Sequence, residues 1–264
     1  LERRRAAKVC HYYPMNRKFL PLLTALAAAL VSCKQADTGS DSQAGAHENP
    51  LVEGEAVTEA KVVEHYAELV SATYEDALAQ AKTMQADVNA FLSEPTAELM
   101  QKARDSWTAA RLPYLQTEVF RFYEGPIDDE DGPEGLLNAW PMDEAYIDYV
   151  KGNAGSGVVN NVAEFPSIDA ALIESLNEKD GEANISCGYH AIEFLLWGQD
   201  FSADGPGERP FTDYTTADNA DRRGDYLRAV TNLVVEKLEG LVAEWVPAKD
   251  NYRGEFLKLP TSKA

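Results

Sequence analysis

The chain has 264 residues, a hydrophobic fraction of 45% and a formal net charge of -20 at pH 7. This length allows one large domain or two small ones, with enough apolar residues for a sizeable core. The acidic charge argues against nucleic acid as a partner, because phosphate backbones attract basic surfaces, whereas an acidic surface concentrates cations.

The N-terminal region has the pattern of a targeting signal rather than of a folded domain. Residues 15–32, MNRKFLPLLTALAAALVS, have a basic start followed by an apolar run, which is typical of a secretory signal peptide. The run is too short to indicate a membrane-spanning helix. Residues 1–14 precede this signal, and we expect them to be an upstream, non-native extension without function.

The signal ends in LVSC, which resembles the lipobox of bacterial lipoproteins. That resemblance implies that Cys33 becomes the first mature residue and carries a lipid. The alternative is an ordinary signal peptide followed by a chance cysteine. Residues 33–55 are rich in Ser, Gly, Asp and Ala, so we expect a flexible tether between the lipid and a domain over 56–264.

Two long helices open the domain. Apolar residues recur at spacings of three and four from Val57 onward, which predicts a helix over 57–94 with Thr58 as a plausible cap. A second helix is predicted over 96–123, and Pro113 is expected to kink it.

The remaining pattern is also helical. An acidic loop over 124–135 precedes helical segments at 141–152, 167–181 and 188–197, a loop over 199–213 and a long helix from about 216 to 245. Because no run of alternating strands interrupts these segments, the sequence predicts an all-α fold.

The segment GYHAIEFLLWGQD, residues 188–200, places two polar side chains in a stretch built for burial. Residues three apart lie on the same helix face, so His190 and Glu193 point the same way and Trp197 continues that face. Together the pair offers a neutral nitrogen and a carboxylate oxygen to a metal ion. A hydrogen-bonded pair that fills a polar spot in the core is the alternative.

The scarcity of histidine narrows the choice of metal. His11 lies upstream and His47 lies in the tether, which leaves His65 and His190 for the domain, so a three-histidine zinc site is not available. The zinc-peptidase motif HExxH and its inverse are absent, since Phe194 stands where the inverse motif needs a second histidine. A metal site here must therefore be rich in carboxylates, which favours iron, calcium, manganese or magnesium over structural zinc.

Glu118 is the candidate third ligand. It continues the helix face of Arg111 and Tyr114, and its apolar neighbours allow a buried carboxylate. A salt bridge to Arg111 or Arg121 is the alternative reading.

Other candidates have simpler readings. Asp128 belongs to an acidic run that lacks the spacing of a calcium loop, and Asp143 is equally suited to capping a helix. Cys187 and His190 lie too close in sequence to be a typical nucleophile and base, and Cys187, as the single cysteine of the domain, has no partner for an internal disulfide.

Several motifs together resemble the imelysin family. One is the G-x-H-x-x-E pattern that contains His190 and Glu193. The others are WTAARLPYLQTEVFRFYEGPID, NAWPMDEAYIDYV and RRGDYL, which follow one another in this order along the chain. The resemblance implies a helical fold of two bundle-like halves with a site at their junction, and a lipoprotein linked to iron or haem uptake. Members of the family are usually longer, so we expect the chain to lack much of the second half.

The resulting hypothesis is a lipid-anchored protein of the bacterial envelope, periplasmic or on the outer-membrane surface, that binds iron, haem or another metal in an uptake system. Its proposed metal ligands are His190, Glu193 and Glu118, with iron as the expected ion and zinc or calcium as alternatives. The expected partners are the metal or haem, the membrane through the lipid on Cys33, and an outer-membrane uptake receptor. A metallopeptidase, the activity in the family's label, is the alternative function, and a structural lipoprotein without a site is the third.

Overall fold

The structure is a computed structural model that describes residues 57–261 and 263. The upstream extension, the signal peptide, Cys33 and the tether lie outside the described residues. The elements are α1 (Glu59–Ser93), α2 (Ala97–Gln116), η1 (Thr117–Phe120), α3 (Glu134–Leu137), α4 (Glu144–Ile147), α5 (Gly157–Asn160), α6 (Ala170–Leu176), α7 (Gly188–Trp197), η2 (Phe211–Tyr214), α8 (Ala220–Trp245) and α9 (Tyr252–Phe256). Over this part of the chain there is no strand, and the prediction of an all-α fold is confirmed.

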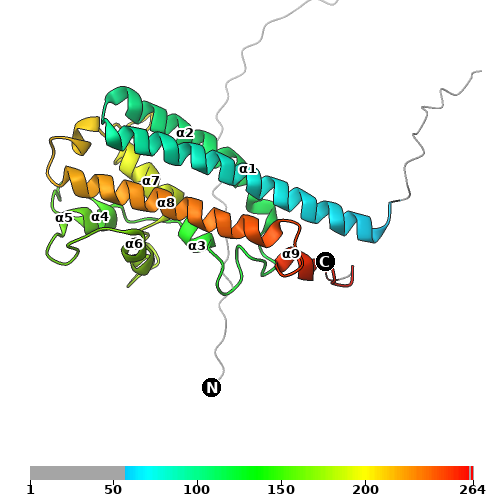
Figure 1. Cartoon of the computed structure of the whole chain (residues 1–264). Helices are drawn as coiled ribbons and strands as arrows, with labels where there is room; N and C mark the ends of the chain where they lie inside the picture. Colours follow the sequence, from blue (N-terminus) through cyan, green and yellow to red (C-terminus); the bar gives the residue numbers. More distant parts are fainter. Residues whose placement is uncertain (1–56, 262, 264) are drawn as a thin grey trace, which may run out of the picture. The chain divides into compact units, whose positions relative to one another are not determined.

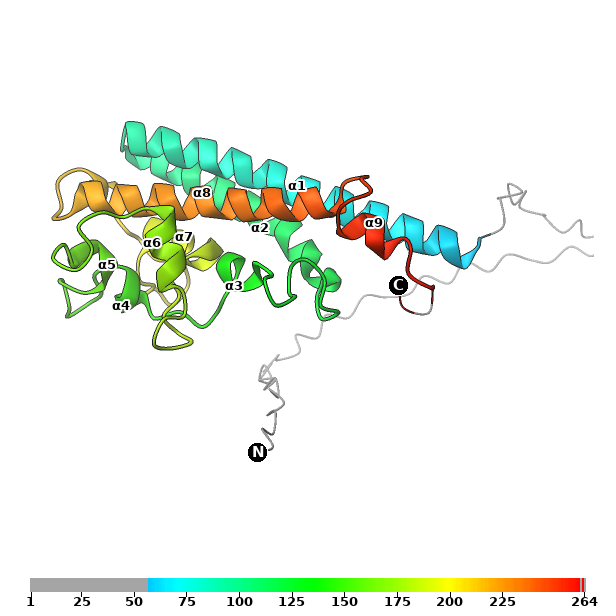
Figure 2. The same cartoon turned by 60° about the horizontal axis from the view of Figure 1, so that its bottom comes forward.

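Three long helices form the frame of the domain. α1 packs along both α2 and α8, while α7 packs against α8 and α2. Figure 1 shows α1, α2 and α8 running side by side. Figure 2 shows α7 and the short helices α3 to α6 together on one side of these long helices. Among the described residues, no helix has the length and apolar character needed to cross a membrane.

The first long helix forms where the sequence predicts it, α2 ends at Gln116 rather than near 123, and α8 starts at Ala220 rather than near 216. Caps and apolar stripes explain where α1 and α2 begin. The hydroxyls of Thr58 and Thr96 accept hydrogen bonds from the backbone N–H groups of Lys61 and Leu99, which satisfies donors left free at a helix start. The buried hydrophobic residues of α1 recur every three or four positions and are Ala67, Val70, Tyr74, Ala77, Ala81, Met84, Val88 and Phe91. Burial of each large member contributes roughly 1.5–3 kcal/mol relative to an exposed side chain.

The middle of the chain is less regular than the sequence predicts. The segment expected to be helical over 141–152 contains only α4, because the backbone becomes extended at Asp148. The segment expected over 167–181 contains only α6, which ends where the side chain of Asn177 bonds to the Gly135 carbonyl and the Ser186 N–H. In both cases contacts with distant residues replace the next helical turn.

Candidate functional site

Helix α7 carries the HxxE pair between two glycines that the backbone requires. Gly188 has φ 84°, and a Cβ there would lie 2.6 Å from the Leu137 carbonyl oxygen. Gly198 ends the helix with φ 69°, a conformation that residues with side chains rarely adopt. The core-facing residues of α7 are fully buried, namely Ala191, Ile192, Leu195 and Leu196. The helix is therefore fixed at both ends and along one face.

The other face of α7 presents His190 and Glu193. The Nδ1 atom of His190 lies 3.0 Å from Oε2 of Glu193, and the two side chains are 19% and 44% exposed. A neutral imidazole that donates from Nδ1 to the carboxylate keeps Nε2 as its free acceptor. The pair is thus hydrogen-bonded, as the alternative reading expected, yet it retains the nitrogen and an oxygen that a metal would use.

This face opens onto a pocket of about 440 Å³, which we call the histidine pocket. Three carboxylates line it beside the imidazole, namely Glu144, Glu193 and Asp200. Among the described residues that line the pocket there is no lysine or arginine. Arg111 lies outside the lining but interacts electrostatically with Glu193. One arginine does not balance three carboxylates, so the pocket has a negative potential that favours a cation.

Aromatic side chains form the walls of the histidine pocket. Trp107, Trp140 and Trp197 all line it, and the ring of Trp140 lies 4.9 Å from the ring of His190. The indole N–H of Trp107 donates to the carbonyl of Tyr189 at 2.9 Å, which ties α2 to α7. Trp197 shares the pocket with His190 and Glu193, as their spacing along one helix face predicts.

Glu144, at the start of α4, is a pocket residue that the sequence analysis missed. Its Oε2 accepts a hydrogen bond of 2.6 Å from the side-chain amide of Gln199, whose own carbonyl oxygen accepts one of 2.6 Å from the backbone N–H of Lys151. This chain of contacts holds the carboxylate at the pocket wall. The neighbouring Asp143 caps α4 by accepting a hydrogen bond from the Ala145 N–H, which agrees with its reading as a cap.

Glu118 lies away from this pocket. Its carboxylate is 51% exposed and forms an ion pair of 3.4 Å with Arg121, one of the two salt bridges that the sequence analysis left open. The face that Arg111 and Tyr114 share does not extend to it, because α2 ends at Gln116 and the chain continues as the tighter 3-10 helix η1. The structure therefore brings together His190 and Glu193 but not Glu118.

The remaining candidates have structural roles. The side chain of Asp128 accepts hydrogen bonds from the backbone N–H groups of Phe122 and Gly125 and so organises the acidic loop. Cys187 is buried, and burial raises the pKa of its thiol to about 12. The thiol therefore stays protonated near neutral pH, which argues against a nucleophile. Over the described part of the chain, no group of three or more His, Cys, Asp or Glu side chains is already arranged to hold a metal ion.

A second polar cluster lies deeper in the domain. We call Asp148, Arg209, Asp213 and Arg223 the buried ion cluster, since their side chains are at most 9% exposed. Asp148 Oδ2 accepts from Arg209 Nη1 at 2.8 Å and from Arg223 Nε at 2.6 Å, while Asp213 accepts from Arg209 at 3.0 Å. Burial alone would raise the pKa of Asp148, but the Arg223 hydrogen bond and the charges of both arginines hold that pKa below its usual range.

Comparison with known proteins gives a consistent result. The family model described as Imelysin matches residues 70–264. Iron-regulated protein A of Synechococcus elongatus is 26% identical over 192 residues, which are 72% of this chain and 42% of the relative. A crystal structure from Parabacteroides distasonis, of a protein assigned as an iron-regulated protein A precursor, has a TM-score of 0.53 and 21% identity over 78% of this chain and 52% of its own. The chain thus spans about half the length of each of these relatives, and the crystal structure supports the fold.

Proposed function

The chain belongs to the imelysin family, and on that premise we propose that it binds iron in the bacterial envelope as part of an uptake system. The observation that carries the proposal is the histidine pocket, in which one imidazole and three carboxylates share a cavity without a lysine or arginine among its described lining residues. The two relatives that are named for iron regulation support iron as the cargo. A lipid on Cys33 would hold the protein at the membrane, periplasmic or on the outer-membrane surface, beside an uptake receptor.

In this proposal His190 binds iron through Nε2. The Glu193 carboxylate accepts a hydrogen bond from the Nδ1–H group of His190. This contact sets both the tautomer and the orientation of the imidazole ring, which is the common arrangement around histidine ligands. Oxygen ligands come from Glu193, Glu144 and Asp200, which line the same pocket. Carboxylate and imidazole together suit iron better than a soft thiolate-binding metal.

The pocket is much larger than a bare ion, and no three ligands converge in the described residues. Iron binding therefore requires the carboxylates to close around the ion, or the ion to arrive with ligands of its own such as water or the porphyrin of haem. The tryptophan walls provide the apolar surface that a bound organic ligand needs.

The test is anaerobic titration of the metal-free protein with ferrous iron, followed by calorimetry. His190→Ala, Glu193→Gln and Glu144→Gln should each weaken binding, with His190→Ala the most severe. Glu118→Gln is the matched control, because it removes a carboxylate outside the pocket. If His190→Ala binds iron as tightly as the wild type, the proposal is wrong. If Glu118→Gln weakens binding as much as Glu144→Gln, the carboxylates of the histidine pocket are not the specific oxygen ligands, and that part of the proposal is wrong.

A further inference from the structure

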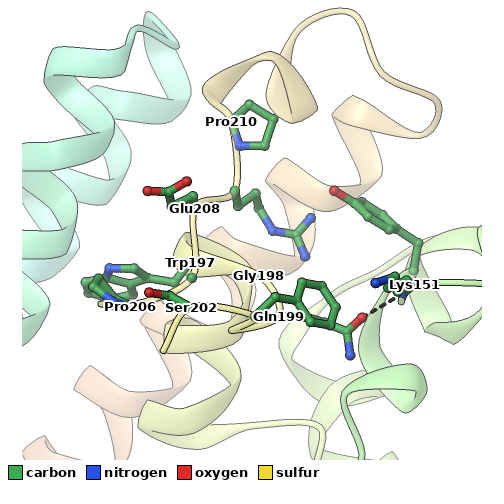
Figure 3. A pocket seen from close by; sticks show the side chains of 12 residues that line it. Lys151, Trp197, Gly198, Gln199, Ser202, Pro206, Glu208 and Pro210 are labelled. Atoms are coloured by element: carbon green, nitrogen blue, oxygen red, sulfur yellow. Dashed lines mark hydrogen bonds between the residues drawn. The ribbon is translucent and has the colours of Figure 1, made fainter. Parts of the chain in front are cut away.

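A second pocket of about 510 Å³ adjoins the histidine pocket along the segment from Trp197 to Gly207. Trp197, Gly198, Pro206 and Gly207 line both pockets, and Gln199, Lys151 and Arg209 are among the residues that line only the second. We call it the arginine pocket. Figure 3 shows Trp197 and Pro206 on one side of this pocket and Lys151 on the other, joined to Gln199 by a hydrogen bond.

Arg209 is the unusual residue of the arginine pocket. Its Nη1 atom donates hydrogen bonds to Asp148 and Asp213 of the buried ion cluster. The Nε atom is buried and has no hydrogen-bond partner, and Nη2 forms no hydrogen bond with a described residue. A buried N–H without a partner loses its hydrogen bonds to water and gains none in return, and an absent ligand is one explanation for such a group. Nε lies close to Gly198, since a Cβ at that residue would stand 3.5 Å from it.

Arg223 shows what such a partner looks like. Its Nε and Nη2 donate to the two carboxylate oxygens of Asp148, at 2.6 and 3.1 Å. This is the two-pronged contact that a planar guanidinium makes with a carboxylate. Arg209 has the same edge of two nitrogens without a described hydrogen-bond partner. The residue lines a cavity, and its guanidinium is stacked on the rings of Tyr149 and Phe194.

The rest of the arginine pocket suits an anion with an apolar body. The ammonium group of Lys151 lies 5.0 Å from the ring centre of Phe201, and no salt bridge joins it to a described carboxylate. Phe201, Trp197 and Tyr149 supply aromatic walls. Glu208 also lines the pocket and opposes an anion, so its charge sets a limit to the affinity.

We propose that the arginine pocket binds a small molecule that carries a carboxylate on a planar, apolar body. Its carboxylate accepts hydrogen bonds from the Nε and Nη2 edge of Arg209, its charge is balanced by Lys151, and its body packs against the aromatic walls. Because the Arg209 side chain is only 1% exposed, binding displaces the loop residues beside Gly198 and opens this edge. The site uses none of the proposed iron ligands, although Gln199, which lines it, also donates a hydrogen bond to Glu144 of the histidine pocket.

The experiment uses metal-free protein, benzoate as the probe, and the ¹⁵N–¹H signal of the arginine Nε–H groups as the readout. Benzoate should shift the Arg209 signal in a saturable manner with a Kd on the order of 1 mM, and benzamide, its neutral isostere, should bind at least about tenfold more weakly because it lacks the charge. Equal binding of the two probes, or saturable benzoate binding without a shift of the Arg209 signal, overturns the proposal, as does the absence of saturable binding.

Charge variants at the pocket rim test the proposal without disturbing the buried ion cluster. Lys151→Met should weaken benzoate binding about fivefold, and Glu208→Gln should strengthen it by a few-fold, since each removes one partly exposed charge. Lys249→Met, an exposed lysine outside the lining of either pocket, is the matched control and should change nothing. The opposite signs expected for Lys151 and Glu208 separate an anion site from general loosening of the fold, and any other pair of signs contradicts it.

Discussion

The buried ion cluster and the histidine pocket both bring carboxylates together with nitrogen-bearing side chains, but they balance charge differently. In the cluster, two aspartates meet two arginines and all four side chains are sealed from solvent. In the pocket, three carboxylates meet one imidazole and the cavity remains open. The matched charges of the cluster neutralise one another within the protein and leave only the Nε edge of Arg209 without a described partner, whereas the unmatched and accessible carboxylates of the histidine pocket attract a cation. We therefore assign Asp148 and Arg223 a role in stability and the histidine pocket a role in binding a cation.

The strongest test of this difference is Asp148→Asn. The change leaves Arg209 and Arg223 buried without the carboxylate that accepts three of their hydrogen bonds. We expect the free energy of unfolding to fall by about 3–5 kcal/mol, measured by urea denaturation. Asp225→Asn, which breaks an exposed ion pair with Arg228, should change it by less than about 0.5 kcal/mol. Equal effects of the two substitutions would mean that the cluster does not stabilise the fold.

Acid should weaken the buried ion cluster. The pKa of Asp148 in the folded protein lies below its usual range, so its contribution to stability is complete above the unfolded-state pKa of about 3.9. That contribution is lost as pH falls from there through the lower folded pKa. The stability difference between wild type and Asp148→Asn should therefore be constant from pH 7 to about 5 and shrink below about pH 4, as measured by denaturation at several pH values. A difference that shrinks already between pH 7 and 6 would show that another group is responsible.

In the histidine pocket the same kind of substitution should affect binding and leave folding intact. Glu193→Gln keeps the shape of a side chain that is 44% exposed, so we expect unfolding to change by less than about 0.5 kcal/mol. Iron affinity should fall about 10–100-fold, the usual cost of losing the partner that orients a histidine ligand. Calorimetric titration and urea denaturation of one preparation measure both. A large loss of stability with unchanged affinity would make the pair a core contact.

The smallest expected effect is that of added zinc on peptidase activity. A catalytic zinc site usually combines three protein ligands with an open position for water, and no such group of three is arranged among the described residues. We therefore expect the zinc-loaded protein to cleave casein no faster than buffer alone. Cleavage that both a chelator and Glu193→Gln abolish would instead support the metallopeptidase alternative.

The sequence predicts the long helices well and the short ones poorly, for a physical reason. α1 and α2 have threonine caps, and all three long helices have apolar stripes. Even so, α2 ends at Gln116 rather than near 123. α8 begins at Ala220 rather than near 216, after Asn219, which adopts a left-handed conformation and makes no side-chain cap hydrogen bond. α4 and α6 depend on partners far away in sequence, such as the arginines that bind Asp148. Local periodicity does not contain that information.

The same limit applies to the candidate site. His190, Glu193 and Trp197 share one helix, so their spacing is sufficient to predict that they lie on one face, which lines the histidine pocket. Glu144 and Asp200 reach it from a single helical turn and a loop, and no spacing rule connects them to α7. The prediction for Glu118 assumed that the α-helical spacing of Arg111 and Tyr114 continues to residue 118, but the α-helix ends at Gln116.

Helix α7 has one face in the core and the other in the histidine pocket, and this division bears on how the protein can be redesigned. Substitutions at 190, 193 and 197 change what the cavity recognises, while the buried residues at 191, 192, 195 and 196 continue to hold the helix in place. New ligand preferences can therefore be sampled in a library at 190 and 193 with little risk of unfolding the domain, whereas Trp197 also packs against Trp107 and the core. Gly188 and Gly198, whose backbone conformations exclude most other residues, are the positions that such a library must leave unchanged.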